Sequence, residues 1–271
     1  MTFFGSWVLA FDTSGHVRRD SDSGVFTLAG VAVPEENART VRRLTQKRLP
    51  EKWGDGGLAG FKAAERIIGQ TLGVSVTHIT GTSAGGWQAF WDEGQRQAEG
   101  LKRVTGQPAH FAGGNLAIRA TLFAVSFARA VSLVLSRRGW KAPAPPNRKD
   151  TVTFSAIFDT DISDPLTQAL FIETLQHSLS AGQFATFANL ELNISACFKT
   201  EQEEPLLMLA DYMAGAFNHA HPAAMLGLPV APVEEVRKAV QAFTEARGAN
   251  LRVVDRPFND IHPLTGMTWE S

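Results

Sequence analysis

Short apolar runs of strand length alternate with longer segments of helical periodicity along this chain. Trp7-Val8-Leu9-Ala10-Phe11 and Val25–Val33 are the first two runs, and the polar segment 13–24 between them indicates an antiparallel pair. Pro34 then begins a segment with acidic residues first and basic residues last, which is typical of a helix. A glycine-rich loop is expected over 53–60. Further strands are expected at 74–80, 151–158, 187–196 and 250–254, and further helices at 61–72, 115–138, 165–179, 205–220 and 233–247.

This order of elements predicts an α/β fold. A strand pair followed by alternating helices and strands is typical of a mixed sheet flanked by helices. We expect residues 1–221 to form the main domain and residues 222–271 to form a C-terminal extension packed on it. No internal repeat is visible in the sequence.

Composition and charge narrow the classes of function. Of the 271 residues, 44% are hydrophobic, which is enough for a large core, and the net charge of −1 gives no global attraction to nucleic acid or to acidic membranes. Cys197 is the one cysteine, so disulfides and cysteine-based zinc sites are excluded. No apolar stretch reaches the length of a membrane span, and the first residues lack the basic lead-in of a signal peptide. The expected location is the cytoplasm.

Three aspartates lie where an acidic metal site would need them. Asp12 ends the first apolar run, Asp159 ends the run Phe154–Phe158, and Asp211 interrupts an apolar helix. A carboxylate at the end of a buried strand is costly unless a positive charge meets it. If the three converge, they would bind a hard cation such as Mg²⁺ or Mn²⁺, with Asp161 as a less certain fourth ligand.

A structural interpretation of these residues stays open. Asp12 precedes Ser-Gly and could begin a turn, and Asp159 could support its own loop. Asp211 is harder to explain in this way, because ionised groups are rarely buried unpaired in an apolar helix. The acidic residues just before that helix, Glu201, Glu203 and Glu204, suit its positive end and are interpreted as caps.

Three short motifs resemble a known bacterial family. They are Asp12-Thr13-Ser14-Gly15, then Phe26–Val33 with the sequence FTLAGVAV, then Ala210-Asp211-Tyr212-Met213-Ala214-Gly215. In this order and spacing they are similar to the family called domain of unknown function 3800, which is regarded as ribonuclease-H-like. The resemblance spans residues 7–220. It implies a ribonuclease-H-like fold and a nuclease-like metal site at Asp12, Asp159 and Asp211, and Lys62 is aligned loosely with a lysine of the family.

The chain departs from the family at one position of the first motif. The family has a glutamate after its first aspartate, and this chain has Thr13. The missing carboxylate would weaken metal binding unless Asp161, Asp20 or Asp22 replaces it. The departure also leaves open that the chain is a non-catalytic binding protein on the same fold.

The expected function is a divalent-metal-dependent nuclease or phosphodiesterase, in which metal held by carboxylates activates a water molecule. The substrate would be nucleic acid or a nucleotide. The alternative enzyme is a serine acyl hydrolase, because Gly81-Thr82-Ser83-Ala84-Gly85 fits the G-x-S-x-G elbow and follows an expected strand. Against it, no later aspartate is followed by glycine or alanine, as a patatin-like dyad would require.

Overall fold

The computed structural model describes residues 2–15, 24–50, 52–69, 72–80, 116–137, 150–160, 190–224 and 232–257, with a few isolated positions between them. The strands are β1 (Thr2–Ser14), β2 (Val25–Pro34), β3 (Gly73–Thr80), β4 (Asp150–Asp159), β5 (Leu190–Lys199) and β6 (Leu251–Pro257). The α-helices are α1 (Glu35–Arg48), α2 (Trp53–Ile68), α4 (Leu116–Arg137), α6 (Leu206–Ala220) and α7 (Val233–Arg247). The helix expected at 165–179 and the elbow at Ser83 lie outside the described residues.

The described strands form one mixed sheet in the order β5-β4-β1-β2-β3-β6. The expected antiparallel pair is confirmed, since β1 and β2 pair from Trp7 with Pro34 to Ser14 with Thr27. Among the six strands, only β2 runs against the others, because β1, β4 and β5 are parallel neighbours and β3 is parallel to β6. This arrangement confirms the α/β, ribonuclease-H-like mixed sheet.

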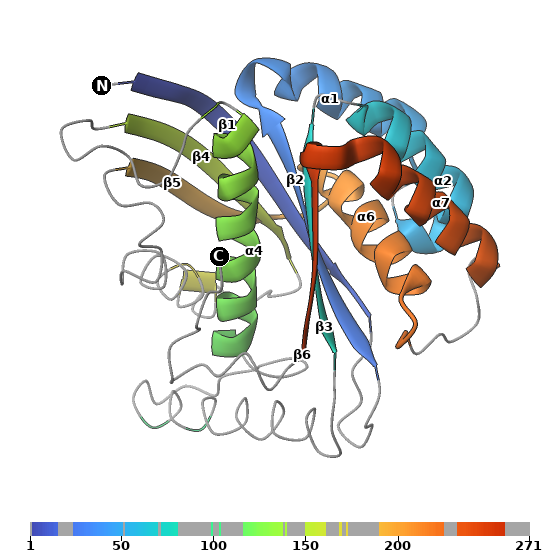
Figure 1. Cartoon of the computed structure of the whole chain (residues 1–271). Helices are drawn as coiled ribbons and strands as arrows, with labels where there is room; N and C mark the ends of the chain where they lie inside the picture. Colours follow the sequence, from blue (N-terminus) through green and yellow to red (C-terminus); the bar gives the residue numbers. More distant parts are fainter. Residues whose placement is uncertain are drawn as a thin grey trace.

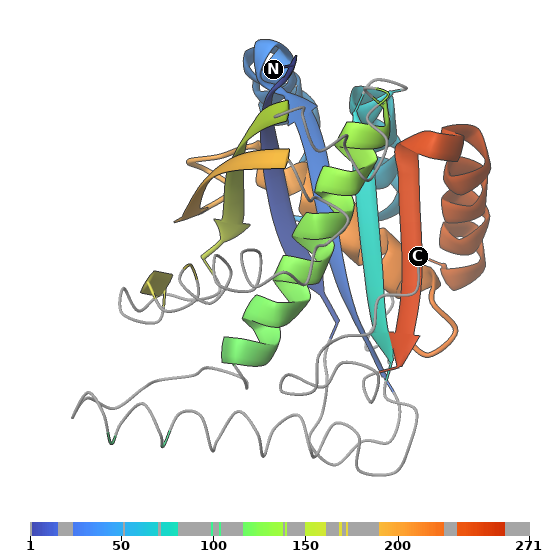
Figure 2. The ribbon, with the colours of Figure 1, turned by 60° about the vertical axis from the view of Figure 1, so that its left-hand side comes forward.

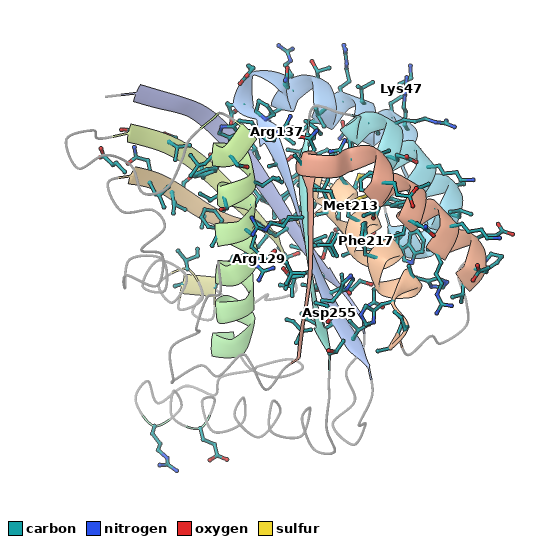
Figure 3. The ribbon with its side chains drawn as sticks, viewed as in Figure 1. Lys47, Arg129, Arg137, Met213, Phe217 and Asp255 are labelled. Carbon is teal, nitrogen blue, oxygen red and sulfur yellow. The ribbon has the colours of Figure 1, made fainter. Side chains whose placement is uncertain are left out.

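The helices that the structure describes are divided unequally between the two faces of the sheet. Helix α4 crosses one face, and α6 packs against β1 and β2 on the other, with α1, α2 and α7 packed around it (Figures 1 and 2). Met213 and Phe217 point from α6 toward the sheet and are buried (Figure 3). None of the helices in the described part of the chain is long and apolar enough to cross a bilayer.

The alternation of side chains along β1 decides which layer its functional residue faces. Val8 and Ala10 belong to the core under α6, whereas the Phe11 ring lies 6.1 Å from that of Phe127 on α4. Because successive side chains of a strand point to opposite faces, Asp12 faces the α6 layer with Val8 and Ala10. On the face of β1 that α6 covers, the apolar side chains of Val8 and Ala10 are thus followed by the carboxylate of Asp12.

Helix α2 begins earlier than the sequence predicted. The glycine-rich segment expected as a loop forms the first turns of α2, with a kink at Gly57, where φ is +47°. A Cβ atom added to Gly60 would lie 2.1 Å from Tyr212 Cε1, and one added to Gly56 would lie 1.9 Å from Tyr212 Oη. These glycines are therefore needed for the close approach of α2 to α6, and not for a flexible loop.

Asn218 of α6 ties together the ends of the first two strands. Its Nδ2 donates hydrogen bonds to the carbonyl oxygens of Ser14 (3.2 Å) and Val25 (2.9 Å) and to Thr27 Oγ1 (3.1 Å). Gly15 passes under this side chain with φ of +109°, and a Cβ there would lie 2.3 Å from the Val25 carbonyl oxygen. The glycine of the first motif is thus fixed by a crowded position that needs a left-handed backbone.

The C-terminal residues join the same sheet. Helix α7 packs on α6, and β6 pairs in parallel with β3, from Leu251 beside Val74 to Pro257 beside Thr80. The division of the chain at residue 221 stays a prediction.

Candidate metal centre

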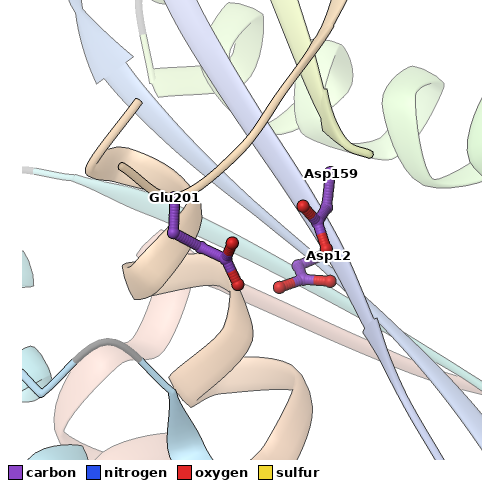
Figure 4. A group of neighbouring side chains, drawn as sticks. All are labelled: Asp12, Asp159 and Glu201. Carbon is purple, nitrogen blue, oxygen red and sulfur yellow. The ribbon is translucent and has the colours of Figure 1, made fainter. Parts of the chain in front are cut away.

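Three carboxylates from separate segments lie close together on the α6 face. Asp12, Asp159 and Glu201 each offer one oxygen, and these oxygens all lie within 4.8 Å of one another (Figure 4). Asp12 and Glu201 are buried and Asp159 is partly buried. Two of the three sequence candidates, Asp12 and Asp159, are therefore brought together by the fold.

The sheet positions the two aspartates. Strands β1 and β4 are parallel neighbours with Phe11 beside Phe158, so the next residues, Asp12 and Asp159, come side by side at the ends of these strands. Each carboxylate accepts a hydrogen bond from the following backbone N–H, Thr13 N to Asp12 (2.6 Å) and Thr160 N to Asp159 (2.7 Å). In α/β sheets the carboxyl ends of parallel strands are the usual place for ligands.

Glu201 comes from the turn between β5 and α6, and the sequence analysis did not select it. Of its two acidic neighbours, Glu204 fits the expected capping role, because it accepts a hydrogen bond from the N–H of Leu206 (3.3 Å), the first residue of α6. Glu203 instead accepts from Thr200 N (2.9 Å), which precedes the helix. Glu204 also forms a two-pronged ion pair with Arg42 of α1, with Nε–Oε1 and Nη2–Oε2 distances of 2.8 Å. This pair holds the turn against α1 while Glu201 points toward the aspartates (Figure 4).

Lys52 brings a positive charge to the edge of the carboxylate group. Its Nζ lies 3.4 Å from Glu201 Oε1, and its side chain is 60% exposed while that of Glu201 is 8% exposed. The charge of Glu201 is the largest cause that raises the pKa of Lys52, and the charges of Asp159 and Asp12 add to it. Lys62, the lysine suggested by the family resemblance, is exposed on α2.

Asp211 lies beside this group and is bonded to the start of α2. Its Oδ2 accepts a hydrogen bond from Trp53 N, the first residue of that helix, where the Lys52 side chain forms no cap. Burial is the main cause that raises the pKa of Asp211 to about 6; the bond from Trp53 opposes this, and the charge of Glu201 adds to it. Asp211 is not one of the three residues whose oxygens lie within 4.8 Å. Its expected role as a metal ligand stays a prediction.

The direction of the side chains along β1 keeps position 13, where this chain has threonine, out of the carboxylate group. Thr13 follows Asp12 on β1, so its side chain points to the opposite face from the carboxylates. The third carboxylate of the group is Glu201. The residues that the sequence suggested as substitutes, Asp161, Asp20 and Asp22, lie outside the described residues.

The donor set fits a hard divalent cation. All three side chains offer carboxylate oxygens, which Mg²⁺, Mn²⁺ and Ca²⁺ prefer. Oxygens bound to one Mg²⁺ lie about 3 Å apart when adjacent and about 4 Å apart when opposite, since each bond is about 2.0–2.1 Å long. The three oxygens here lie within 4.8 Å of one another, so their side chains would have to close in on a bound Mg²⁺.

Comparisons with known proteins return only distant structural likeness. No protein-family model and no curated protein matches the chain. The ribonuclease H2 of Pyrococcus horikoshii OT3 matches with a TM-score of 0.37 and 13% identity, over 97% of this chain and 94% of that chain. Bst-RNase HIII in complex with Mn²⁺ matches with a TM-score of 0.36 and 16% identity, over 91% of this chain and 64% of that chain. A chain of the PCNA:RNase HII complex from Archaeoglobus fulgidus matches with a TM-score of 0.35 and 14% identity, over 88% of this chain and 76% of that chain.

Membership of the family called domain of unknown function 3800 stays a prediction.

Proposed function

We propose that this protein is a divalent-metal-dependent nuclease or phosphodiesterase. The observation that carries the proposal is the convergence of Asp12, Asp159 and Glu201, whose oxygens lie within 4.8 Å of one another at the carboxyl ends of parallel strands. Buried carboxylates repel one another, so such a group is stable only with cations or protons nearby. A cation-binding role explains why the fold brings them together.

In this proposal the residues have distinct roles. Asp12 and Asp159 hold Mg²⁺ or Mn²⁺ from the rigid sheet, and Glu201 holds it from the turn that Arg42 fixes through Glu204. When bound, the ion supplies the positive charge that lowers the pKa of a water molecule and stabilises the leaving oxygen of a phosphodiester. Asp211 is proposed as a further ligand from α6, because the charges of Glu201 and Asp159 reach it. We also propose Asp161 as a ligand, because it follows Asp159 by two residues in the sequence.

The first test is metal binding. Millimolar Mn²⁺ is expected to raise the melting temperature of the wild type through linkage, and Asp12→Asn is expected to abolish that rise. Without metal, Asp12→Asn should melt no lower than the wild type, because one of three repelling carboxylates has been neutralised. Asp211→Asn should weaken Mn²⁺ binding by less than Asp12→Asn, since Asp211 lies outside the closest group. A wild type that does not respond to metal contradicts the proposal.

The second test is cleavage. Labelled single-stranded DNA, single-stranded RNA, duplex DNA and an RNA–DNA hybrid, incubated with Mn²⁺, would reveal the substrate, and Asp159→Asn serves as the inactive control. Metal binding without cleavage of any of these or of bis(4-nitrophenyl) phosphate would instead identify a metal-dependent binding protein.

A further inference from the structure

The backbone around Lys52 is held on α6 by two successive residues of that helix. Trp53 N donates to Asp211, and the Tyr212 hydroxyl donates to the carbonyl oxygens of Lys52 (3.0 Å) and Pro50 (3.3 Å). The Tyr212 ring is fully buried, and Gly60 leaves the space that it occupies. The main chain of Lys52 is thus fixed relative to the carboxylates, although its side chain is mostly exposed.

This arrangement differs from an ordinary surface ion pair. Surface pairs join two mobile side chains, whereas here Glu201 is buried and the lysine backbone is anchored. The ammonium group can therefore move away from the carboxylates toward solvent while the backbone of Lys52 stays in place. Lysine suits such a role, because its charge is compact and its four-carbon stem is flexible.

A divalent ion and the Lys52 ammonium would compete for the same oxygens. Glu201, which would be a metal ligand, has its Oε1 occupied by Lys52 at 3.4 Å. Two cations on one carboxylate repel each other, so entry of the metal favours an outward position for the ammonium. That position lies at the solvent side of the site, where a phosphodiester would bring its own negative charge.

We propose, resting on the function proposed above, that Lys52 is a built-in cation of this site. It compensates Asp12, Asp159 and Glu201 in the metal-free protein, is displaced when a divalent ion binds, and then contacts the phosphate group of the substrate. Lys52 is thereby a substrate-binding residue whose release is coupled to metal binding.

The test compares Lys52→Met with Lys62→Met, which removes the same charge from an exposed position on the same segment. In EDTA, Lys52→Met should lower the melting temperature and Lys62→Met should not, because only the first removes a positive charge that acts on the buried Glu201. By calorimetric titration, Lys52→Met should bind Mn²⁺ about fivefold more tightly than the wild type, since a competing charge is lost. Lys62→Met should bind it with unchanged affinity.

The substrate arm uses the oligonucleotide that the wild type cleaves best, or bis(4-nitrophenyl) phosphate if it cleaves no oligonucleotide. Lys52→Met should raise KM about tenfold or more with a smaller change in kcat, and Lys52→Arg should restore most of the loss in KM. Unchanged or weaker Mn²⁺ binding by Lys52→Met, or equal effects of the two methionine variants, would overturn the inference.

The two proposals fail in different ways. If the wild type binds no Mn²⁺, the proposed function fails, and the metal-free melting temperatures still decide whether Lys52 compensates the carboxylates. If the wild type binds Mn²⁺ and cleaves substrate while Lys52→Met behaves as Lys62→Met does, only the inference about Lys52 fails.

Discussion

Glu201 shows how a single side chain can depend on its neighbours for its position. It is buried in a turn, and the adjacent acidic residues Glu203 and Glu204 are committed to Thr200 and Arg42. These contacts fix the turn and leave Glu201 to face Asp12 and Asp159. Three acids within four positions therefore have three different partners.

The first prediction at the residue scale follows from this difference. Glu201→Gln should weaken Mn²⁺ binding at least tenfold, which corresponds to about 1.4 kcal/mol, because the amide lacks the charge that a hard cation prefers. Glu203→Gln removes the same charge two positions away and should leave the affinity within about twofold, since Glu203 bonds Thr200 at the surface. Calorimetric titration of the two variants would measure this, and equal affinities would exclude Glu201 as a ligand.

Sequence reasoning could find some residues of the site and not others for a physical reason. Asp12 and Asp159 end apolar runs, so a charged residue there stands out against a buried strand. Glu201 follows β5 by two residues within a run of acids that suits a helix start, and nothing local separates it from Glu203 or Glu204. Its role depends on β5 lying beside β4 at the same edge of the sheet, which is a matter of strand order.

At the scale of elements, the contact between α2 and α6 determines where the site residues stand. Helix α6 supplies Asp211 and Tyr212 to the start of α2, and Gly215 leaves room for the Trp53 ring. The rings of Trp53 and Tyr212 meet edge to face with centroids 6.2 Å apart. Lys52 is thus positioned by the packing of two helices as well as by its own loop.

Two glycine substitutions in α2 test this contact. Gly60→Ala should destabilise the protein by about 1–3 kcal/mol, because the new Cβ would lie 2.1 Å from Tyr212 Cε1 and the ring would have to move. Gly54→Ala is the matched control: its Cβ would meet nothing within 4 Å, so about 0.4–1 kcal/mol of stabilisation is expected. Urea unfolding of both variants measures the difference, and similar free energies of unfolding would show that the contact is looser than described.

Most elements could be predicted from periodicity, and the exception is instructive. The helix expected at 233–247 is found as Val233–Arg247, and the strand expected at 74–80 is found as Gly73–Thr80. Residues 53–60 were expected to be a loop because glycine is a poor helix former. In the folded chain Tyr212 needs the space that these glycines leave, and this packing outweighs the local propensity.

At the scale of the whole molecule, a polar network that is buried at Thr27 and His78 and exposed at Asp255 links the C-terminal strand to the centre of the sheet. Asn218 donates to Thr27 Oγ1, so the Thr27 hydroxyl can donate to His78 Nδ1 at 2.9 Å. On its other side, the His78 ring lies 4.8 Å from that of His221, whose Nε2 lies 3.0 Å from Asp255 Oδ2 on β6. The network thus runs from the end of α6 through β3 to β6.

This network predicts that acid loosens the fold. Burial, followed by the charge of His221, lowers the pKa of His78 from 6.5 to about 4, and Asp255 opposes the shift. Well above pH 6.5 the ring is neutral in the folded and unfolded states and contributes no pH dependence. Between pH 6.5 and pH 4, His78 is protonated in the unfolded chain but stays neutral in the folded protein. The free energy of unfolding therefore falls by up to about 3 kcal/mol over this range.

The contribution of His78 can be separated from that of other groups by substitution. His78→Gln keeps an acceptor for Thr27 but does not titrate, so its unfolding free energy should change less between pH 6.5 and 4 than that of the wild type. Urea unfolding at several pH values measures both curves. Parallel curves would mean that His78 takes up its proton equally in both states.

The hydrogen bonds from Asn218 to the ends of β1 and β2 affect which changes of sequence this protein can tolerate. Ser14 and Val25 are joined through α6, so the strand ends next to Asp12 keep their register independently of the length of chain that connects them. Evolution can therefore change the length of the sequence between them without moving the strand position that Asp12 occupies. A peptide tag or fluorescent reporter inserted between residues 15 and 24 would therefore leave the pairing of β1 and β2 intact.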